Sequence, residues 1–234
     1  MDTAQRFEFD LNGVLVIRDV LPPESIRELR SVLVHKLDAG TTGRVRGSLE
    51  GMRSSMLHWD ERYRELLDLP QLSPILEDLI GEPRIALDGL PSFRIDHVYS
   101  QRRREGDGGT SLHGGREGSS HTQNFEFRNG RFHNGLVVVA FELEETVSNG
   151  GGLCCCPGSH KSNIIGDLGF DRSLKDGASS PLVQGIRANA GDVTIFTEAL
   201  LHGTLPWKIK GHDRLTCAFA TPAAAAAAPA ALAL

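Results

Sequence analysis

The sequence predicts a mainly β protein, an antiparallel barrel or jelly roll buttressed by helices near its N-terminus. Short apolar runs bounded by Gly, Pro, Asn or Asp recur through the second part of the chain, as antiparallel strands separated by turns do. Patterns of helical spacing are confined to the first 80 residues, which places helices against a β layer and not between its strands. The predicted strands are residues 94–99, 136–143, 152–156, 182–187, 193–197 and 215–220.

The N-terminal part predicts a strand, a turn and an amphipathic helix, in that order. Apolar residues alternate over residues 7–20, which favours a strand. After Pro22 and Pro23, apolar residues recur at helical spacing from 26 to 37, and proline is common at the first turn of a helix. Residues 61–80 predict one or two further short helices interrupted by prolines.

The chain of 234 residues is long enough for one β-rich domain with a buried core. We expect a single domain over residues 1–220 and an Ala- and Pro-rich low-complexity tail over 221–234. A net charge of -5 gives no reason to expect nucleic acid or an anionic membrane as partner. No segment has the length and apolarity of a signal peptide or a membrane span, so we expect a cytoplasmic protein, with its oligomeric state left open.

Two local clusters of residues are better explained by structure than by chemistry. Cys154, Cys155 and Cys156 are consecutive, and neighbours on a strand face opposite sides, so they suit neither a disulfide framework nor a zinc site. We expect small apolar strand residues there. The basic residues 102–104, and those around Arg44 and Arg46, are expected to be solvated loop faces.

Two histidines stand out among the nine. His113 and His202 are each followed by glycine, which leaves room for an ion and a substrate to approach. Arg214 follows His202 by 12 positions on the next predicted strand. Its planar guanidinium could hold a carboxylate through two hydrogen bonds.

The chain resembles the phytanoyl-CoA dioxygenase-like family of 2-oxoglutarate oxygenases from about residue 7 to about residue 219. Four strings in the family's order carry this resemblance: FDLNGVLVI with VLPPE at 9–24, NGGGL at 149–153, PGSHK at 157–161, and AGDVTIF leading to LHGT at 190–204. The resemblance implies a double-stranded β-helix fold, Fe(II) and 2-oxoglutarate as cofactors, and O2 and a small molecule as the other reactants.

The resemblance also implies roles for single residues. His113 and His202 are the expected iron ligands, and Arg214 and the hydroxyl of Thr204 are expected to bind the far carboxylate of 2-oxoglutarate. His160 is expected to be structural, and Asp192 to close a turn. Two pocket walls are suggested from topology alone, Asn134 beside the co-substrate and Asp96 before the first histidine.

One position departs from the family pattern. A facial triad needs two imidazoles and one carboxylate, and the family supplies the carboxylate two positions after the first histidine, where this chain has Gly115. In the family's halogenases a small residue stands there and a halide binds the metal instead. Alternatively, Glu117 or Glu198 supplies the carboxylate, although Glu117 also suits a solvated loop and Glu198 an acid that orients His202.

The sequence therefore predicts a non-haem Fe(II)- and 2-oxoglutarate-dependent oxygenase that oxidises, by hydroxylation, an unactivated C–H bond of a small molecule. Halogenation with a halide at the position of the missing carboxylate is the first alternative. A non-catalytic small-molecule-binding relative is the second.

Overall fold

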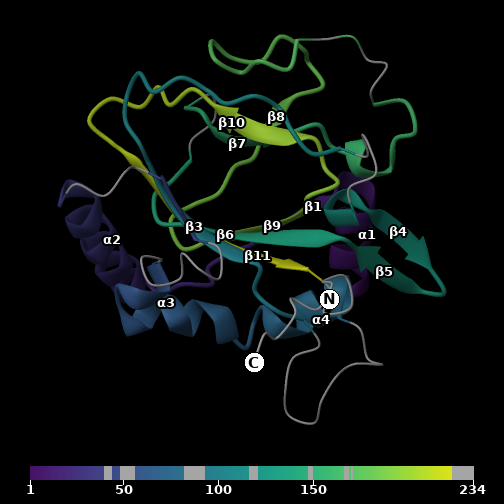
Figure 1. The fold of residues 1–234 in the computed structure, drawn as a ribbon, viewed down its shortest axis with the longest axis horizontal. Coiled ribbons are helices and arrows are strands. Elements are labelled where there is room, and N and C mark those ends of the chain that lie inside the picture. The colour runs from purple at the N-terminus through teal and green to yellow at the C-terminus, as the bar shows by residue number, and fades with distance from the viewer. Residues whose placement is uncertain are drawn as a thin grey trace, which may run out of the picture.

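The computed structural model describes residues 1–39, 44–47 (backbone alone), 56–81, 93–115, 121–146, 150–165, 169 and 171–222. Two antiparallel sheets face each other, and helices cover the outer side of the larger one (Figure 1). The predicted jelly-roll class is thereby confirmed. Within the described part of the chain, no helix is both long and apolar enough to cross a membrane.

The larger sheet has six strands in the order β1-β9-β6-β11-β3-β2, and its neighbours are all antiparallel. The smaller sheet has the order β10-β7-β8, and β4 and β5 form a separate hairpin. The strand bounds are β1 Val14–Ile17, β2 Arg44–Gly47, β3 His97–Arg103, β4 Phe125–Arg128, β5 Arg131–Asn134, β6 Leu136–Glu142, β7 Gly152–Cys155, β8 Gln184–Gly185, β9 Val193–Thr197, β10 His202–Leu205 and β11 Arg214–Pro222.

The central strands of the larger sheet are apolar on both faces because both faces are covered. On β6, Val137 and Phe141 pack toward the helices, in one cluster with Leu29 and Leu79. Val138 and Ala140 point the other way, into the space between the sheets, where they meet Cys155 of the smaller sheet. The helical elements are α1 Thr3–Asn12, α2 Pro23–Asp38, η2 Met56–His58, α3 Glu61–Glu65, η3 Leu66–Asp68, α4 Ser73–Ile80, η4 His121–Gln123 and η5 Ser159–Lys161.

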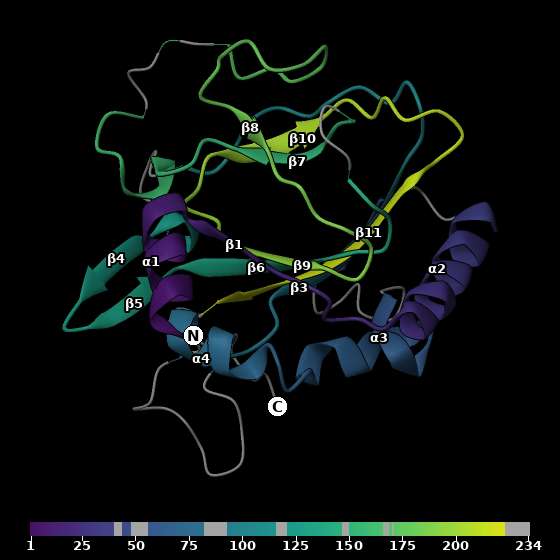
Figure 2. The same ribbon diagram turned by 180° about the vertical axis from the view of Figure 1, so that it is seen from behind.

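The prediction of an opening strand over residues 7–20 is wrong for its first half, which belongs to helix α1. Asp2 accepts a hydrogen bond from the Gln5 amide, and the Gln5 side chain bonds back to the Asp2 amide, so a capping box starts the helix. Gly13 ends it in the left-handed conformation at φ 75°. Only Val14–Ile17 is extended, and it pairs with β9 (Figure 2).

The helix predicted after the two prolines is α2, and β6, β7, β9 and β11 fall on predicted strands. The strand predicted at 94–99 begins and ends later, as β3. Arg102 therefore lies on a strand and not on a solvated loop, and it pairs with Asp38 and Asp213. Hairpin β4–β5 and strand β2 were not predicted. Strand β11 continues through Pro222, and the rest of the Ala-rich tail lies outside the described residues.

The three consecutive cysteines are small buried strand residues, as predicted, and all three are free thiols. Cys155 faces the space between the sheets, whereas Cys154 and Cys156 belong to an apolar cluster on the outer side of the smaller sheet. Burial raises the pKa of the Cys154 thiol to about 12 and that of Cys155 likewise to about 12. These thiols are therefore protonated and unreactive at neutral pH.

Both residues given structural roles from the sequence have them. His160 is fully buried, its Nε2 lies 3.0 Å from the Asp10 carbonyl oxygen, and its ring meets Phe125 edge-on. The Asp192 carboxylate accepts hydrogen bonds from the backbone amides of Asp19 and Asn189 and thereby closes a turn.

Candidate metal centre

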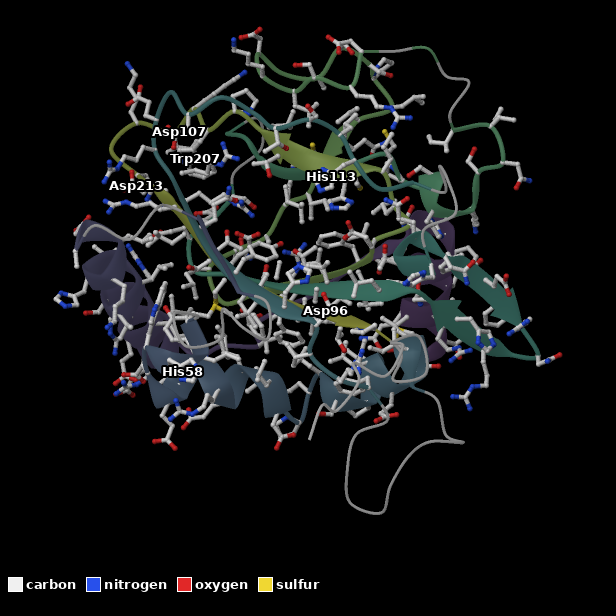
Figure 3. All side chains as sticks on the ribbon, viewed as in Figure 1. His58, Asp96, Asp107, His113, Trp207 and Asp213 are labelled. Atoms are coloured by element: carbon white, nitrogen blue, oxygen red, sulfur yellow. The ribbon has the colours of Figure 1, made fainter. Side chains whose placement is uncertain are left out.

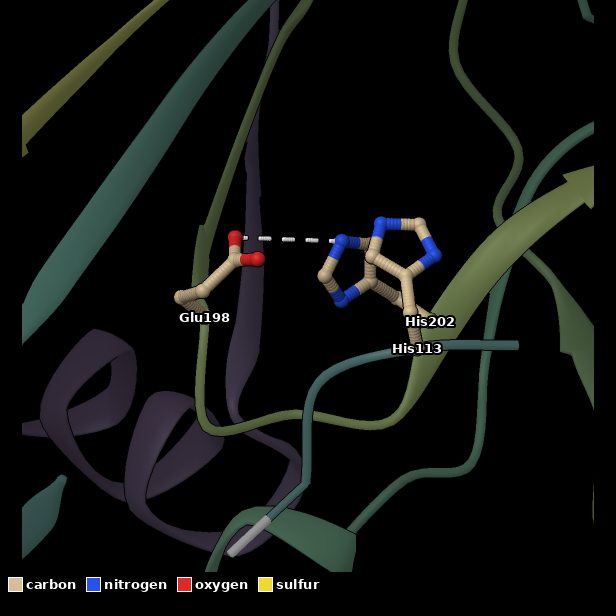
Figure 4. A group of neighbouring side chains, drawn as sticks. All are labelled: His113, Glu198 and His202. Carbon is tan, nitrogen blue, oxygen red and sulfur yellow. Dashed lines mark ion pairs between the residues drawn. The ribbon is translucent and has the colours of Figure 1, made fainter. Parts of the chain in front are cut away.

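His113 and His202 are brought together by a single antiparallel bridge between the segment after β3 and the start of β10. Each residue donates its backbone amide to the carbonyl of the other at 2.9 Å, and the ring centroids are 4.2 Å apart. Both rings face the space between the sheets (Figures 3 and 4). The pairing predicted between residues 89 positions apart in the sequence is therefore present as a contact.

Each of the two imidazoles uses its Nδ1 in a hydrogen bond to a backbone carbonyl, which leaves Nε2 on both rings for a metal. His113 Nδ1 lies 3.0 Å from the Ser111 carbonyl oxygen, and His202 Nδ1 lies 2.7 Å from the Leu200 carbonyl oxygen. A carbonyl only accepts, so each Nδ1 carries the proton of the neutral ring and each Nε2 keeps its lone pair. Metal-binding histidines are held by such bonds, which fix both tautomer and ring orientation.

The two rings differ in exposure. His113 is exposed, whereas His202 is buried against the Phe196 ring at a centroid distance of 4.7 Å. Burial, with a smaller contribution from the neighbouring His113, lowers the pKa of His202 to about 3. His202 is therefore neutral at physiological pH, the state in which an imidazole binds a metal.

A carboxylate lies beside the histidine pair. Glu198 follows β9, and its Oε2 lies 3.9 Å from His202 Nε2 (Figure 4). One ligand atom from each of His113, Glu198 and His202 lies within 4.8 Å of the other two. Because Leu200 already holds His202 Nδ1, Glu198 approaches the nitrogen that faces a metal. The sequence offered Glu198 both as a metal ligand and as an acid that orients His202, and the structure places its carboxylate on the Nε2 side of the ring.

Gly115, the position of the family carboxylate, does not face the histidines. Its φ is 80°, and a Cβ built on it would lie 3.8 Å from side-chain atoms of Ile165 and Leu201. Both of these belong to the apolar cluster on the outer side of the smaller sheet. A side chain at this position would therefore begin among apolar groups.

A cavity of about 370 Å³ opens beside the two histidines. Its wall combines polar and apolar side chains and comes from both sheets and from the segment that carries His113; it includes Tyr99, Gln101, Thr110, Leu153, Phe196 and Thr204. Of these, Thr204 was predicted as a site residue, whereas Tyr99 and Gln101 were not. The signal that could have found them is the period-two alternation of β3, which puts both side chains on the inner face.

Arg214 lies just beyond this cavity, at the start of β11. The residue is buried, and its Nη2 donates to Glu142 Oε1 at 2.5 Å. Its Nε is buried and has no hydrogen-bond partner among the described residues. Gly152, the neighbour of Leu153 in the cavity wall, leaves room at this nitrogen, because a Cβ there would lie 3.3 Å from it. A buried donor without a partner beside a cavity suits a carboxylate ligand.

The remaining predicted residues do not gather at the cavity. Asn134 is buried at the end of β5, where its Nδ2 donates to the Leu79 carbonyl of α4 at 2.8 Å. Asp96 precedes β3 with a half-exposed side chain that lies 2.7 Å from His97 Nδ1 (Figure 3). Neither lines the cavity, so we do not carry them forward as pocket walls. Glu117 lies outside the described residues.

The donor set fits a divalent transition metal. Two imidazole nitrogens and one carboxylate oxygen are the protein ligands of non-haem Fe(II) oxygenases, and His113, His202 and Glu198 offer these donors close together. The jelly roll and this donor set together define the class as that of the Fe(II)- and 2-oxoglutarate-dependent oxygenases.

The comparisons with known proteins agree with this class. The family model for phytanoyl-CoA dioxygenase (PhyH) matches residues 9–208, and the chain belongs to this family. Its assignment as a 2-oxoglutarate-dependent oxygenase with Fe(II) and 2-oxoglutarate as cofactors is thereby confirmed. A comparison with curated proteins finds no match.

Several solved structures share the fold. HygX from Streptomyces hygroscopicus, crystallised with nickel and 2-oxoglutarate, has 25% identity and a TM-score of 0.76, and the match covers 96% of this chain and 88% of HygX. AviO1 from Streptomyces viridochromogenes Tue57 has 17% identity and a TM-score of 0.64, with 96% of each chain covered. The epimerase SnoN from nogalamycin biosynthesis, at 14% identity and a TM-score of 0.62 over 93% of this chain and 81% of SnoN, likewise shows the fold alone.

Proposed function

We propose that this chain hydroxylates an unactivated C–H bond of a small molecule, with Fe(II) held at His113 and His202 and with 2-oxoglutarate and O2 as co-substrates. One observation carries the proposal. The Nε2 atoms of two histidines whose Nδ1 atoms bond to backbone carbonyls lie near the same cavity as the buried Nε of Arg214, which has no hydrogen-bond partner among the described residues. The two Nε2 atoms suit a metal, and the Arg214 Nε suits a carboxylate.

Each residue has a defined task in this proposal. His113 and His202 hold the metal through Nε2, and their Nδ1 protons stay bonded to backbone carbonyls. Arg214 and the Thr204 hydroxyl bind the far carboxylate of 2-oxoglutarate. When bound, Fe(II) and 2-oxoglutarate supply O2 activation coupled to loss of CO2 from the co-substrate, chemistry that belongs to the cofactors and not to a side chain.

Glu142 holds Arg214 in place. It lies on β6 next to β11, and its second oxygen accepts from the Thr216 hydroxyl at 3.1 Å. The carboxylate thus has a partner on each oxygen, and it fixes one edge of the guanidinium while the Nε edge remains for a ligand. A planar group held in this way loses little freedom when it binds a second carboxylate.

A small-molecule substrate agrees with a fold relative. A crystal structure of HygX, 23% identical to this chain, holds nickel, 2-oxoglutarate and hygromycin B together. The cavity wall offers hydrogen-bonding groups from Tyr99, Gln101 and Thr110 beside apolar surface, which suits a substrate that carries both kinds of group. The geometry at Gly115 does not favour halogenation over hydroxylation, because a Cβ built at this position would contact Ile165 and Leu201.

Calorimetric titration of 2-oxoglutarate under anaerobic conditions tests the proposal. We expect 2-oxoglutarate to bind the Fe(II)-loaded protein tightly and the metal-free protein weakly, because the metal and Arg214 hold opposite ends of the molecule. On admission of O2, succinate should form only when both Fe(II) and 2-oxoglutarate are present. Equal 2-oxoglutarate affinity with and without Fe(II), or no succinate from the loaded protein, would contradict it.

A further inference from the structure

We infer that Glu198 supplies the metal carboxylate in place of the residue at position 115. The iron site is then a complete facial triad whose carboxylate comes from the turn between β9 and β10. The inference rests on the proposed function, because it concerns the same metal. It distinguishes hydroxylation from halogenation, since a site with its own carboxylate has no need of a halide ligand.

The geometry at His202 is the first argument. The Nδ1 atom of His202 is bonded to the Leu200 carbonyl, so the neutral ring directs its Nε2 lone pair toward the Glu198 carboxylate 3.9 Å away. Two acceptors that face each other need a hydrogen-bond donor or a cation between them. A metal that also reaches His113 satisfies all three groups, whose ligand atoms lie within 4.8 Å of one another.

The turn that carries Glu198 is the second argument. Leu200 N donates to the Thr197 carbonyl at 2.9 Å, and this tight turn connects β9 to β10. The turn supplies both the carbonyl that orients His202 and the carboxylate beside its metal-facing nitrogen. The Glu198 amide is held by the Leu136 carbonyl at 2.9 Å, so the backbone under the carboxylate is fixed to β6.

The glycine pair after His113 is the third argument. A Cβ on Gly114 would lie 2.4 Å from the Leu200 carbonyl oxygen and 2.7 Å from that of Glu198. Only glycine lets the two segments approach this closely at φ 80°. The same backbone conformation turns position 115 away from the histidines. Gly114 thereby brings the backbone of the Glu198 turn close to the segment that carries His113.

Anaerobic Fe(II) titration of Glu198 variants tests this inference. Loss of an outer-shell partner typically weakens metal binding roughly 10- to 100-fold, so removal of a direct ligand in Glu198→Ala should weaken it by about 100-fold or more. Glu198→Gln keeps the shape of the side chain and should lose a similar factor. Glu145→Gln, which changes an exposed acid on the loop after β6, should bind Fe(II) like the wild type. Thermal melting of each metal-free variant checks that the fold is intact.

The effect of chloride on the spectrum of the wild-type complex is a second test, and it requires no substitution. The spectrum of the wild-type Fe(II)–2-oxoglutarate complex should not change when chloride replaces a non-coordinating anion. Gly115→Asp introduced into the Glu198→Gln variant should not restore Fe(II) affinity, because position 115 faces apolar side chains.

Three results would overturn the inference: wild-type Fe(II) affinity in a folded Glu198→Gln protein, a chloride-dependent spectrum, or recovery of affinity through Gly115→Asp. The first and third results leave the proposed function standing, since that function fails instead if 2-oxoglutarate binds equally with and without Fe(II) or if the loaded protein forms no succinate. A chloride-dependent spectrum would also favour halogenation over hydroxylation.

Discussion

The role assigned to Arg214 can be tested separately from its contribution to stability. Arg214 is 3% exposed and Glu142 1% exposed, and they form a buried ion pair. Removal of one partner of such a pair costs roughly 3–5 kcal/mol of stability because the other charge is left uncompensated. A simple Arg214→Ala variant would therefore confuse loss of 2-oxoglutarate binding with loss of the fold.

The double variant Arg214→Met with Glu142→Gln removes both charges together, and replacement of a whole buried pair is often close to neutral for stability. It should melt near the wild-type temperature, whereas Arg214→Met alone should melt well below it. Both should lose 2-oxoglutarate affinity, by roughly 2–5 kcal/mol for loss of a buried, charge-assisted partner, which is about 30-fold to several thousand-fold in Kd.

The assay is anaerobic calorimetry of 2-oxoglutarate against Fe(II)-loaded protein, with Fe(II) affinity measured in parallel. We expect Fe(II) affinity to be nearly unchanged in the double variant, because Arg214 does not touch the histidines. Glu142→Gln alone keeps the guanidinium and, in its folded state, should retain 2-oxoglutarate binding, but it should melt below the wild type because the Arg214 charge is left uncompensated. Wild-type 2-oxoglutarate affinity in a folded double variant would refute the assignment of Arg214.

Two further predictions concern the histidines and one turn. His113→Ala and His202→Ala should each abolish stoichiometric Fe(II) binding, whereas His121→Ala, His133→Ala and His212→Ala should not; full Fe(II) occupancy after loss of His202 would show that the ligands are misassigned. Burial alone raises the pKa of Asp192, but hydrogen bonds from the Asn189 and Asp19 amides and from Arg18 outweigh it, and the pKa lies below its ordinary value of 3.8. A lowered carboxyl pKa stabilises the fold above the unfolded-state pKa and loses that contribution as pH falls through the folded-state pKa. Asp192→Asn should therefore lower the melting temperature at pH 7, and the difference should shrink below about pH 4; a constant difference down to pH 2 would contradict this reasoning.

The sequence predicted the parts of the fold that depend on strong local patterns. Strand β6 is an unbroken apolar run, and α2 begins at a proline pair and keeps helical spacing throughout. Helix α1 was missed because its signal lies in a capping box of Asp2 and Gln5 and not in the apolar pattern, which alternates. Local propensity was therefore outweighed there by hydrogen bonds at the helix ends.

The candidate site, like the fold, was predicted from the sequence only in part. Resemblance to the family located His113 and His202, and the structure brings them into contact. The direction of Gly115 depends on a left-handed backbone, and the approach of Glu198 depends on a turn that packs across the barrel. Neither follows from spacing along the chain. Asn134 was misjudged for a similar reason, because its position at the end of β5 says nothing about the α4 carbonyl that it contacts.

Anaerobic absorption spectroscopy tests the central claim most directly. Fe(II) and then 2-oxoglutarate are added to the wild-type protein, and the visible charge-transfer band of the chelated pair is followed. The band should appear only when both are present, should be absent from His202→Ala, and should require far more 2-oxoglutarate in the Arg214→Met, Glu142→Gln double variant. A folded wild-type protein that takes up Fe(II) and 2-oxoglutarate in excess without any visible band would contradict the account.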